Sequence, residues 1–386
     1  MKKKKTKKIA INELGGSQWT GGVTYRVNLL KALKIHPAFD FKNVFLIVSS
    51  KSDAEKMPIP ENQVLELPKP KGRVDGLWCS FLKKYFNYDV LMSRIVKENN
   101  IDVIFPCYMK AGKAKSIYWM PDFQFMHLPN FFTKKAVKNF NVKLPKYFKL
   151  ADSIVLSSED AKNDFKRFSP EFLNKTRVMR FVAHVPENVY QKSVDEISSE
   201  YKIPKKFMYL PNQFWAHKNH EIVFKALGIL KHRGVTPFLV LTGNPVDVRN
   251  PGYLAGMLES ISKLGIRNQV AILGLIPHHF VYALMRHADF VINPSLFEGW
   301  STTVEECKSL GKKMILSNLN VHQEQQPLNS TYFDPTNADQ LADKIEDYWL
   351  NTTTPIDAGL EHQARETIES RSIEFAERFL NIEILL

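Results

Sequence analysis

The chain has 386 residues, 44% of them apolar, which is typical of two or three globular domains and excludes a disordered or fibrous protein. No apolar run reaches the length of a membrane span, and the lysine-rich start lacks the apolar segment of a secretory signal. Three widely spaced cysteines, Cys79, Cys107 and Cys307, exclude a disulfide framework and a thiol metal motif and favour a reducing, cytoplasmic compartment.

Charge is unevenly distributed along the chain. The net charge is +13, yet residues 1–190 carry 34 basic and 17 acidic residues, a net charge of +17, and the remainder carries −4. A basic half predicts an anionic partner, either nucleic acid or an anionic membrane surface. No stretch resembles a nucleic-acid-binding motif, so the nucleic-acid hypothesis depends on charge alone. The lysine-rich start is equally well explained as a solubilising tail.

The first predicted strand, residues 9–14, precedes two glycine pairs. These are Gly15-Gly16 and Gly21-Gly22, and helical apolar spacing begins at Val23. A strand, a glycine loop and a helix can bring backbone N–H groups close to a phosphate, although most glycine pairs are simply turns. Further strands are predicted at residues 44–49, 101–106 and 116–122, and residues 151–168 are predicted to form a strand, a serine cap and a helix.

Two basic and aromatic segments lie in the first half. Residues 77–86 form one, with aromatic side chains on one helical face next to Lys83 and Lys84. Packing in the core is the default interpretation of such a face, and an interfacial helix is the alternative. Residues 134–149 form the second, with six lysines around Phe140, Tyr147 and Phe148.

Polar residues follow the predicted strand that ends at Pro121. They are Asp122, Gln124 and His127. Residues just beyond the carboxyl end of a parallel strand face the crevice of an α/β sheet, so these are candidate site residues. They could equally be loop residues without chemistry.

The second half begins after a proline-bounded polar stretch, residues 186–205, which we interpret as a linker. A strand then ends at Pro211-Asn212 and a helix starts near Asn219. Lys218 therefore lies at a helix N-terminus, where the helix dipole disfavours a cation unless it holds an anion. His217 and His220 have no acidic or thiol partners at metal-ligand spacing, so no metal is expected.

Residues 293–311 are the most informative stretch. A buried strand stops at Asn293-Pro294, Glu298 and Gly299 follow in a loop, and a short helix ends at Gly311. The loop and the helix N-terminus form an anion site, and Glu298 and Glu306 could bind hydroxyl groups. Alternatively, Thr303 and Glu306 form a capping box and Glu298-Gly299 is an ordinary turn.

The pattern Pro-Ser-x-x-Glu298-Gly, a second glutamate eight residues later and then Gly311 resembles the retaining glycosyltransferases of family four. The likeness is to the bacterial polysaccharide and lipopolysaccharide type, which is mannosyltransferase-like. It implies an α/β, GT-B fold: two Rossmann-like, doubly wound domains that face each other across a cleft. The expected organisation is an acceptor-side domain at residues 1–185, a linker at 186–205, and a nucleotide-sugar domain at 206–362. The helix at 363–386 would pack back on the first domain.

The resemblance also implies roles for residues on the donor side. Glu298 would face the donor sugar and Glu306 the ribose. Lys218 would bind the diphosphate, with Gln213 at a position where the family has arginine. Other donor contacts are implied as well. Gly22 in the first glycine loop, and Gly299, Thr302 and Thr303 after Glu298, would contribute backbone contacts. Ile276 would contact the base.

On the acceptor side, the resemblance makes Asp122 the candidate base or orienting group, because Pro121 replaces a histidine that many relatives have. Gln124 and His127 would lie beside it. Trp300-Ser301-Thr302-Thr303 also departs from the aromatic-Gly-apolar-Pro sequence of many members. This departure bears on the identity of the sugar.

The expected activity is hexosyl transfer, with retention, from a nucleotide sugar to a growing glycan or glycolipid in bacterial surface polysaccharide synthesis. No cofactor, metal or nucleic acid is expected. The basic half would hold the protein peripherally on the cytoplasmic face of the membrane. A nucleotide-sugar epimerase of the same fold is the alternative, and it would convert the donor without an acceptor.

Overall fold

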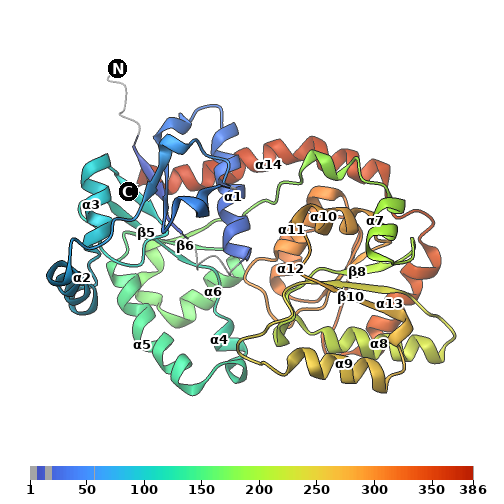
Figure 1. Cartoon of the computed structure of the whole chain (residues 1–386). Helices are drawn as coiled ribbons and strands as arrows, with labels where there is room; N and C mark the ends of the chain where they lie inside the picture. Colours follow the sequence, from blue (N-terminus) through green and yellow to red (C-terminus); the bar gives the residue numbers. More distant parts are fainter. Residues whose placement is uncertain (1–6, 14–19, 56, 386) are drawn as a thin grey trace. The chain divides into compact units, whose positions relative to one another are not determined.

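The computed structural model describes residues 7–13, 20–55 and 57–385 (Figure 1). It divides into two compact units. The first comprises residues 1–123, 134–182 and 369–386, and the second comprises residues 124–133 and 183–368. The expected linker, residues 186–205, lies within the second unit and contains a 3₁₀ turn, Glu187–Val189, and helix α7, Val194–Tyr201.

A parallel seven-stranded sheet forms the centre of the first unit. Its strands run in the order β3 (Val64–Glu66), β2 (Val44–Val48), β1 (Ile9–Ile11), β4 (Val103–Phe105), β5 (Lys115–Met120), β6 (Ser153–Leu156) and β7 (Thr176–Val178). Most of these strands are short, buried apolar runs, as expected for a parallel sheet covered on both faces. The strand order reverses between β1 and β4, which makes the sheet doubly wound.

Helices accompany this sheet in the first unit, and all of them except α2 bury apolar residues. They are α1 (Thr20–Ile35), α2 (Arg73–Phe86), α3 (Val90–Asn99), α5 (Lys134–Leu150) and α6 (Glu159–Phe168). The end of the long helix α14 (Ala358–Leu385) also belongs to this unit. There the ring of Phe375 lies 5.9 Å from Tyr25, and that of Phe379 lies 5.2 Å from Phe105.

Three expectations for the first half need correction or comment. Gly21 and Gly22 lie in the first turn of α1, not in a loop before it, because the helix begins at Thr20. Gly15-Gly16 lies outside the described residues. The default interpretation of residues 77–86 as core is wrong, since α2 has no buried residue. By contrast, α5 buries Leu144 and Phe148 and exposes its lysines.

The second unit repeats the same sheet topology. Its six parallel strands run in the order β10 (Val270–Gly274), β9 (Leu239–Thr242), β8 (Met208–Leu210), β11 (Val291–Asn293), β12 (Met314–Ser317) and β13 (Ser330–Phe333). The order reverses between β8 and β11. The predicted fold class, α/β with two doubly wound Rossmann-like domains, is therefore confirmed.

Helices cover both faces of this second sheet, and alternate residues of each strand face opposite sides. Met208 and Leu210 pack toward α8 (His220–His232), α9 (Tyr253–Lys263) and α13 (Ala338–Asn351). Tyr209 packs toward α7, α10 (His278–His287) and α11 (Thr302–Leu310). Figure 1 shows the two groups of helices on opposite sides of the strands. Side chains that are to bind a ligand must therefore lie beyond the strand ends.

No helix within the described part of the chain is long and apolar enough to cross a lipid bilayer.

Candidate functional site

The candidate site lies at the carboxyl ends of β8 and β11, where the strand order of the second unit reverses. Asn212 follows β8, and Asn293 is the last residue of β11; both side chains are buried. The Nδ2 of Asn212 donates to the Oδ1 of Asn293 at 3.1 Å. Ligands of open α/β sheets bind at this switch point, because the loops from the two strands diverge there.

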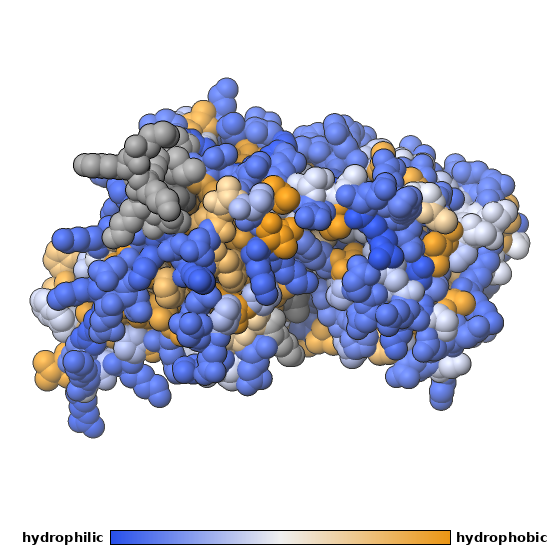
Figure 2. Space-filling view, turned by 90° about the horizontal axis from the view of Figure 1, so that it is seen from above, coloured by the Kyte–Doolittle hydropathy of each residue, from blue (hydrophilic) through white to orange (hydrophobic). Residues whose placement is uncertain are grey.

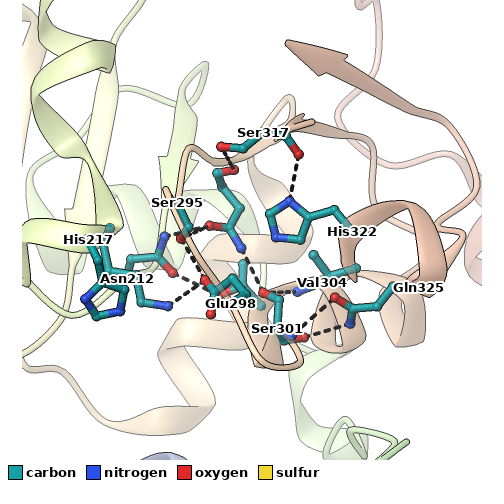
Figure 3. A network of polar contacts seen from close by, with 12 residues as sticks. Asn212, His217, Ser295, Glu298, Ser301, Val304, Ser317, His322 and Gln325 are labelled. Atoms are coloured by element: carbon teal, nitrogen blue, oxygen red, sulfur yellow. Dashed lines mark hydrogen bonds and ion pairs between the residues drawn. The ribbon is translucent and has the colours of Figure 1, made fainter. Parts of the chain in front are cut away.

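Asn293 organises the loop that follows β11, and Figure 3 shows three residues bonded to it, Asn212, Ser295 and Ser301, close together. Its Nδ2 donates to the Oγ of Ser301 at 2.8 Å, and its Oδ1 lies 2.8 Å from the Oγ of Ser295. The Thr303 hydroxyl donates to the Oδ1 of Asn212 at 3.1 Å. Residues 293–303 are thus held in one conformation by buried hydrogen bonds to both central strands, as a preorganised site requires.

Close approach of β9 to the β8 loop depends on Gly243. Its φ is +149°, and a Cβ at this position would lie 2.2 Å from the backbone oxygen of Asn212. Only glycine fits there, because the obstacle is backbone that cannot rotate away.

Helix α11 begins two residues earlier than a capping box at Thr303 requires. Ser301 is the N-cap, and its Oγ accepts from the N–H of Val304 at 3.4 Å. The side chain of Gln325, on α12 (Asn320–Gln325), bonds both the N–H and the C=O of Ser301. The capping-box alternative is therefore wrong, and Glu306 is not used as a cap. Gly311 ends the helix in the left-handed conformation, as predicted.

Lys218 and Glu298 form a buried ion pair. Lys218 ends a 3₁₀ turn, Ala216–Lys218, directly before α8, and its Nζ donates to the Oε1 of Glu298 at 2.6 Å. The two side chains are only 14% and 10% exposed. Burial would raise the pKa of Glu298, but the charge and the hydrogen bond of Lys218 dominate and lower it to about 2. Glu298 is thus ionised at neutral pH.

Three histidines surround this pair, and all are neutral at pH 7. Burial, followed by the charge of Lys218, lowers the pKa of His217 and of His220 to about 3. Burial also lowers the pKa of His322, whose Nδ1 lies 2.9 Å from the carbonyl oxygen of Ser317 and so carries the proton. Figure 3 shows His217 and His322 on either side of Glu298. Among the described residues, no three His, Cys, Asp or Glu side chains group as a metal site.

The Lys218–Glu298 pair is expected to lose its stabilising effect in acid. The folded-state pKa of Glu298, about 2, lies below its ordinary value of 4.5. Its contribution to the free energy of unfolding, about 3 kcal/mol, is therefore complete above pH 4.5 and is lost as the pH falls toward 2. Urea unfolding at pH 6 and pH 3.5 should show a smaller difference between wild type and Glu298→Gln at the lower pH. A difference that is independent of pH would contradict the assigned pKa.

Glu306 lies on α11 and faces α10. It is buried, its Oε1 lies 3.5 Å from the Nε2 of His278, and it accepts a hydrogen bond from Tyr282. Ile276 is half-buried between β10 and α10, and packs on the same face of the sheet. Glu306 thus contacts α10, and Ile276 packs on the hydrophobic cluster to which α10 and α11 contribute.

The other predicted donor residues are distributed as follows. Gly299 and Thr302 are half-buried in the loop and at the start of α11, whereas Gly22 belongs to the first unit. Gln213 follows Asn212, and its Oε1 accepts from the N–H of Asn244 at 2.8 Å. The side-chain oxygen of Gln213 therefore holds the loop after β9 in place.

Residues 124–133 belong to the second unit although they precede the rest of it in the chain. Gln124, on the short helix α4 (Gln124–His127), accepts a hydrogen bond from Arg249 at 2.9 Å. The ring of His127 lies 5.0 Å from that of Phe297, the neighbour of Glu298. Two of the three predicted acceptor residues are thus in contact with the loops of the site. Asp122 is half-buried and lies in the first unit.

Arg249 is the main site residue that the sequence analysis missed. Its Nη2 lies 3.4 Å from the Nδ1 of His217, and its guanidinium lies over the rings of Trp215 and Phe132. It lies seven residues past the end of β9, too far along the loop for the rule that selected Asp122 to identify it from sequence. His322 was missed too, because a lone histidine carries little signal by itself, and Ser295 was part of the quoted pattern without a role of its own.

Comparison with known proteins agrees with this geometry. Residues 193–367 match the family described as glycosyl transferases group 1. In structure, the chain is similar to a glycosyltransferase from Rickettsia africae, with a TM-score of 0.68 and 19% identity over 98% of this chain and 97% of that chain. No curated protein sequence matches the chain significantly.

Two further structural neighbours are informative. Anabaena HepE in complex with UDP and glucose has a TM-score of 0.71 and 15% identity over 99% of this chain and 100% of that chain. The lipopolysaccharide outer core galactosyltransferase WaaB has a TM-score of 0.60 and 14% identity over 97% of this chain and 99% of that chain. The fold is that of the GT-B glycosyltransferases, and the family match and the fold together support a glycosyltransferase.

Proposed function

We propose that the protein transfers a sugar from a nucleotide-sugar donor to a glycan or lipid-linked glycan, with retention of configuration, in the synthesis of a bacterial surface polysaccharide. The observation that carries this proposal is the buried Lys218–Glu298 pair at the switch point of the second unit. A buried lysine at the start of a helix is matched to an anion, and a glycosyl donor releases its anion, a nucleoside diphosphate, at such a position.

Lys218 takes the central role in bond cleavage. As the bond from the sugar to the diphosphate breaks, negative charge develops on the departing phosphate oxygens. The ammonium of Lys218 and the amides at the start of α11 stabilise this charge more strongly than they stabilise the intact donor, which lowers the barrier. Arg249 adds a second cation near His217. The proposal includes no metal and no cofactor.

Glu298 binds the donor sugar and does not donate a proton. With a pKa of about 2 it remains a carboxylate at neutral pH, so it accepts hydrogen bonds from sugar hydroxyls. Glu306 accepts from the ribose hydroxyls, with Ile276 near the base. We assign no covalent nucleophile, and the two carboxylates do not form the acid and base pair of a glycoside hydrolase.

The acceptor side is proposed to include Asp122, Gln124 and His127, with Asp122 as the base or orienting group. His127 is exposed and rests on Phe297, next to Glu298. The charge of +17 over residues 1–190 supports an acceptor on an anionic membrane surface, at the cytoplasmic face. HepE, which was solved with UDP and glucose, supports a nucleotide sugar as the donor.

A thermal-shift panel with UDP, GDP, dTDP, ADP and CMP tests this function. A ligand at about 100 times its Kd should raise the melting temperature of wild type by a few degrees. We expect one nucleotide to do so and Glu306→Ala to reduce that shift, because the ribose contact is lost. Glu259→Ala, on the exposed face of α9, is the matched control and should keep the full shift.

The activity assay that follows would use the matching nucleotide sugar. Conversion of the donor to an epimer without an acceptor would favour the epimerase instead. No shift with any nucleotide, together with salt-sensitive binding to single-stranded DNA, would overturn the proposed function.

A further inference from the structure

Helix α2 presents a continuous apolar face to solvent. Val74, Leu77, Trp78, Phe81 and Tyr85 are all exposed, to 82% for Val74, 55% for Trp78 and 62% for Tyr85. Their spacing of three, four, seven and eleven residues from Val74 places them on one side of a helix. Isolated exposed apolar residues are ordinary, but five along one helical face mark a surface for binding.

The aromatic side chains of this face already contact one another. The Phe81 ring lies 5.7 Å from that of Trp78, 5.0 Å from that of Tyr85 and 5.9 Å from that of Phe86. All four rings belong to α2. Because the rings already contact one another in the free protein, binding a partner would immobilise fewer side chains, which lowers the entropic cost of binding.

A bidentate ion pair on the flank of α2 fixes the helix to the first unit. Arg94, on α3, donates to both carboxylate oxygens of Asp75 at 2.5 and 3.0 Å. Asp75 also accepts from the N–H of Lys71 at 2.7 Å. These contacts hold the helix in one orientation and neutralise the acidic side chain of its first turn.

Basic residues surround the apolar face. Residues 69–86 contain Asp75 as their one acidic residue and five exposed basic residues, Lys69, Lys71, Arg73, Lys83 and Lys84. In Figure 2 hydrophobic surface appears at the left edge, the side on which Figure 1 places α2 and α3, and hydrophilic surface borders it.

This combination of residues selects the kind of partner. Aromatic and apolar side chains flanked by lysines are typical of helices that lie in the headgroup region of an anionic bilayer. Lysine is depleted at protein interfaces, where its charge would have to be desolvated. The charge of the helix complements anionic phospholipid, and its apolar face is narrow enough to lie flat in the interface.

We propose that α2 docks the protein on an anionic phospholipid surface, with Trp78, Phe81 and Tyr85 inserted among the headgroups and with Lys84, which lies on the flank of this face beside Tyr85, on lipid phosphates. This inference rests on the proposed function in one respect: a lipid-linked acceptor gives the enzyme a reason to bind the bilayer.

Vesicle co-sedimentation tests the docking directly. Wild type should bind vesicles of 70% phosphatidylcholine and 30% phosphatidylglycerol, and binding should weaken as salt is raised. The triple variant Trp78→Ser, Phe81→Ser, Tyr85→Ser should bind about 100-fold or more weakly, since three apolar side chains no longer leave water. The pair Lys83→Gln, Lys84→Gln should bind about tenfold more weakly and with less dependence on salt.

The matched control is Leu258→Ser with Leu350→Ser, two exposed apolar residues of the second unit outside α2. This variant should bind vesicles like wild type. Unchanged vesicle binding by the triple variant would overturn the proposal. Equal binding of wild type to pure phosphatidylcholine would overturn it as well. So would a wild-type dimer that the triple variant dissociates without any vesicle binding, because α2 would then be a subunit contact.

Nucleotide binding separates this proposal from the proposed function. The triple variant should keep the melting temperature of wild type and its nucleotide-induced shift, because α2 buries none of its residues. Loss of vesicle binding with an intact nucleotide shift supports docking by α2. Failure of wild type to bind any nucleotide would refute the proposed function and leave the vesicle result to be judged separately.

Discussion

Replacing Lys218 with alanine is expected to lower kcat/KM for sugar transfer by about 10²–10³-fold and the free energy of unfolding by about 3–5 kcal/mol. The first effect follows from the loss of the ammonium group that stabilises the negative charge of the departing diphosphate. The second follows because Glu298 remains buried and ionised without its partner at 2.6 Å. Nucleotide release at saturating donor measures the first effect, and urea unfolding measures the second.

A second variant separates the two effects. In Lys218→Ala with Glu298→Gln neither position carries a charge, so part of the stability should return while transfer stays low. Lys308→Ala is the matched control. Lys308 also pairs with a buried glutamate, Glu305, at 3.1 Å, but it has no proposed contact with the donor. It should lose stability and retain transfer within a few-fold. Near-normal transfer by Lys218→Ala would show that Lys218 does not bind the departing phosphate.

Replacing Asn293 with leucine is expected to lower the free energy of unfolding by about 3–5 kcal/mol. Leucine has the same branching as asparagine, but it leaves the Nδ2 of Asn212 without its buried acceptor. It also removes one of the two partners of the Ser295 and Ser301 hydroxyls, which keep Glu298 and the N–H of Val304. Each lost hydrogen bond costs about 1–3 kcal/mol. Contacts within one network are not additive, which keeps the total below the sum. The same change should release the loop that carries Glu298 and reduce the nucleotide-induced thermal shift.

Asn351→Leu provides the control for this prediction. Asn351 also donates a side-chain hydrogen bond, to Asp347 at 2.7 Å, but it is exposed at the end of α13. Its replacement should change the free energy of unfolding by no more than about 0.5 kcal/mol. A loss below about 1 kcal/mol for Asn293→Leu would mean that the buried network does not hold the loop.

Local features of the structure could be predicted from the sequence. The strand ending at Asn293, the helix that follows it and the glycine that ends that helix at residue 311 all formed as expected. So did the start of α8 near Asn219, which is its N-cap. Apolar periodicity, turn residues and helix ends depend on neighbours a few residues away, and the sequence displays those neighbours directly.

Other local assignments failed where tertiary contacts outweighed local preference. The N-cap of α11 is Ser301 and not Thr303, because Asn293 and Gln325 hold Ser301 in place from other elements. The aromatic face of α2 resembles a core stripe in sequence, yet it is exposed. Periodicity identifies an apolar face, but it does not say whether another element of the chain covers that face.

The sequence by itself determined the two α/β halves, the order of their elements and the residue types at the ends of the strands. Only the tertiary structure decided which of these residues meet. Lys218 and Glu298 are 80 residues apart, and they pair because β8 and β11 are neighbours at the point where the strand order reverses. Arg249, in the loop after β9, contacts Gln124, and residues 124–133 belong to the second unit, so residues distant in sequence meet at the same site. Strand order is set by the packing of whole helices and strands, and no short window of sequence contains it.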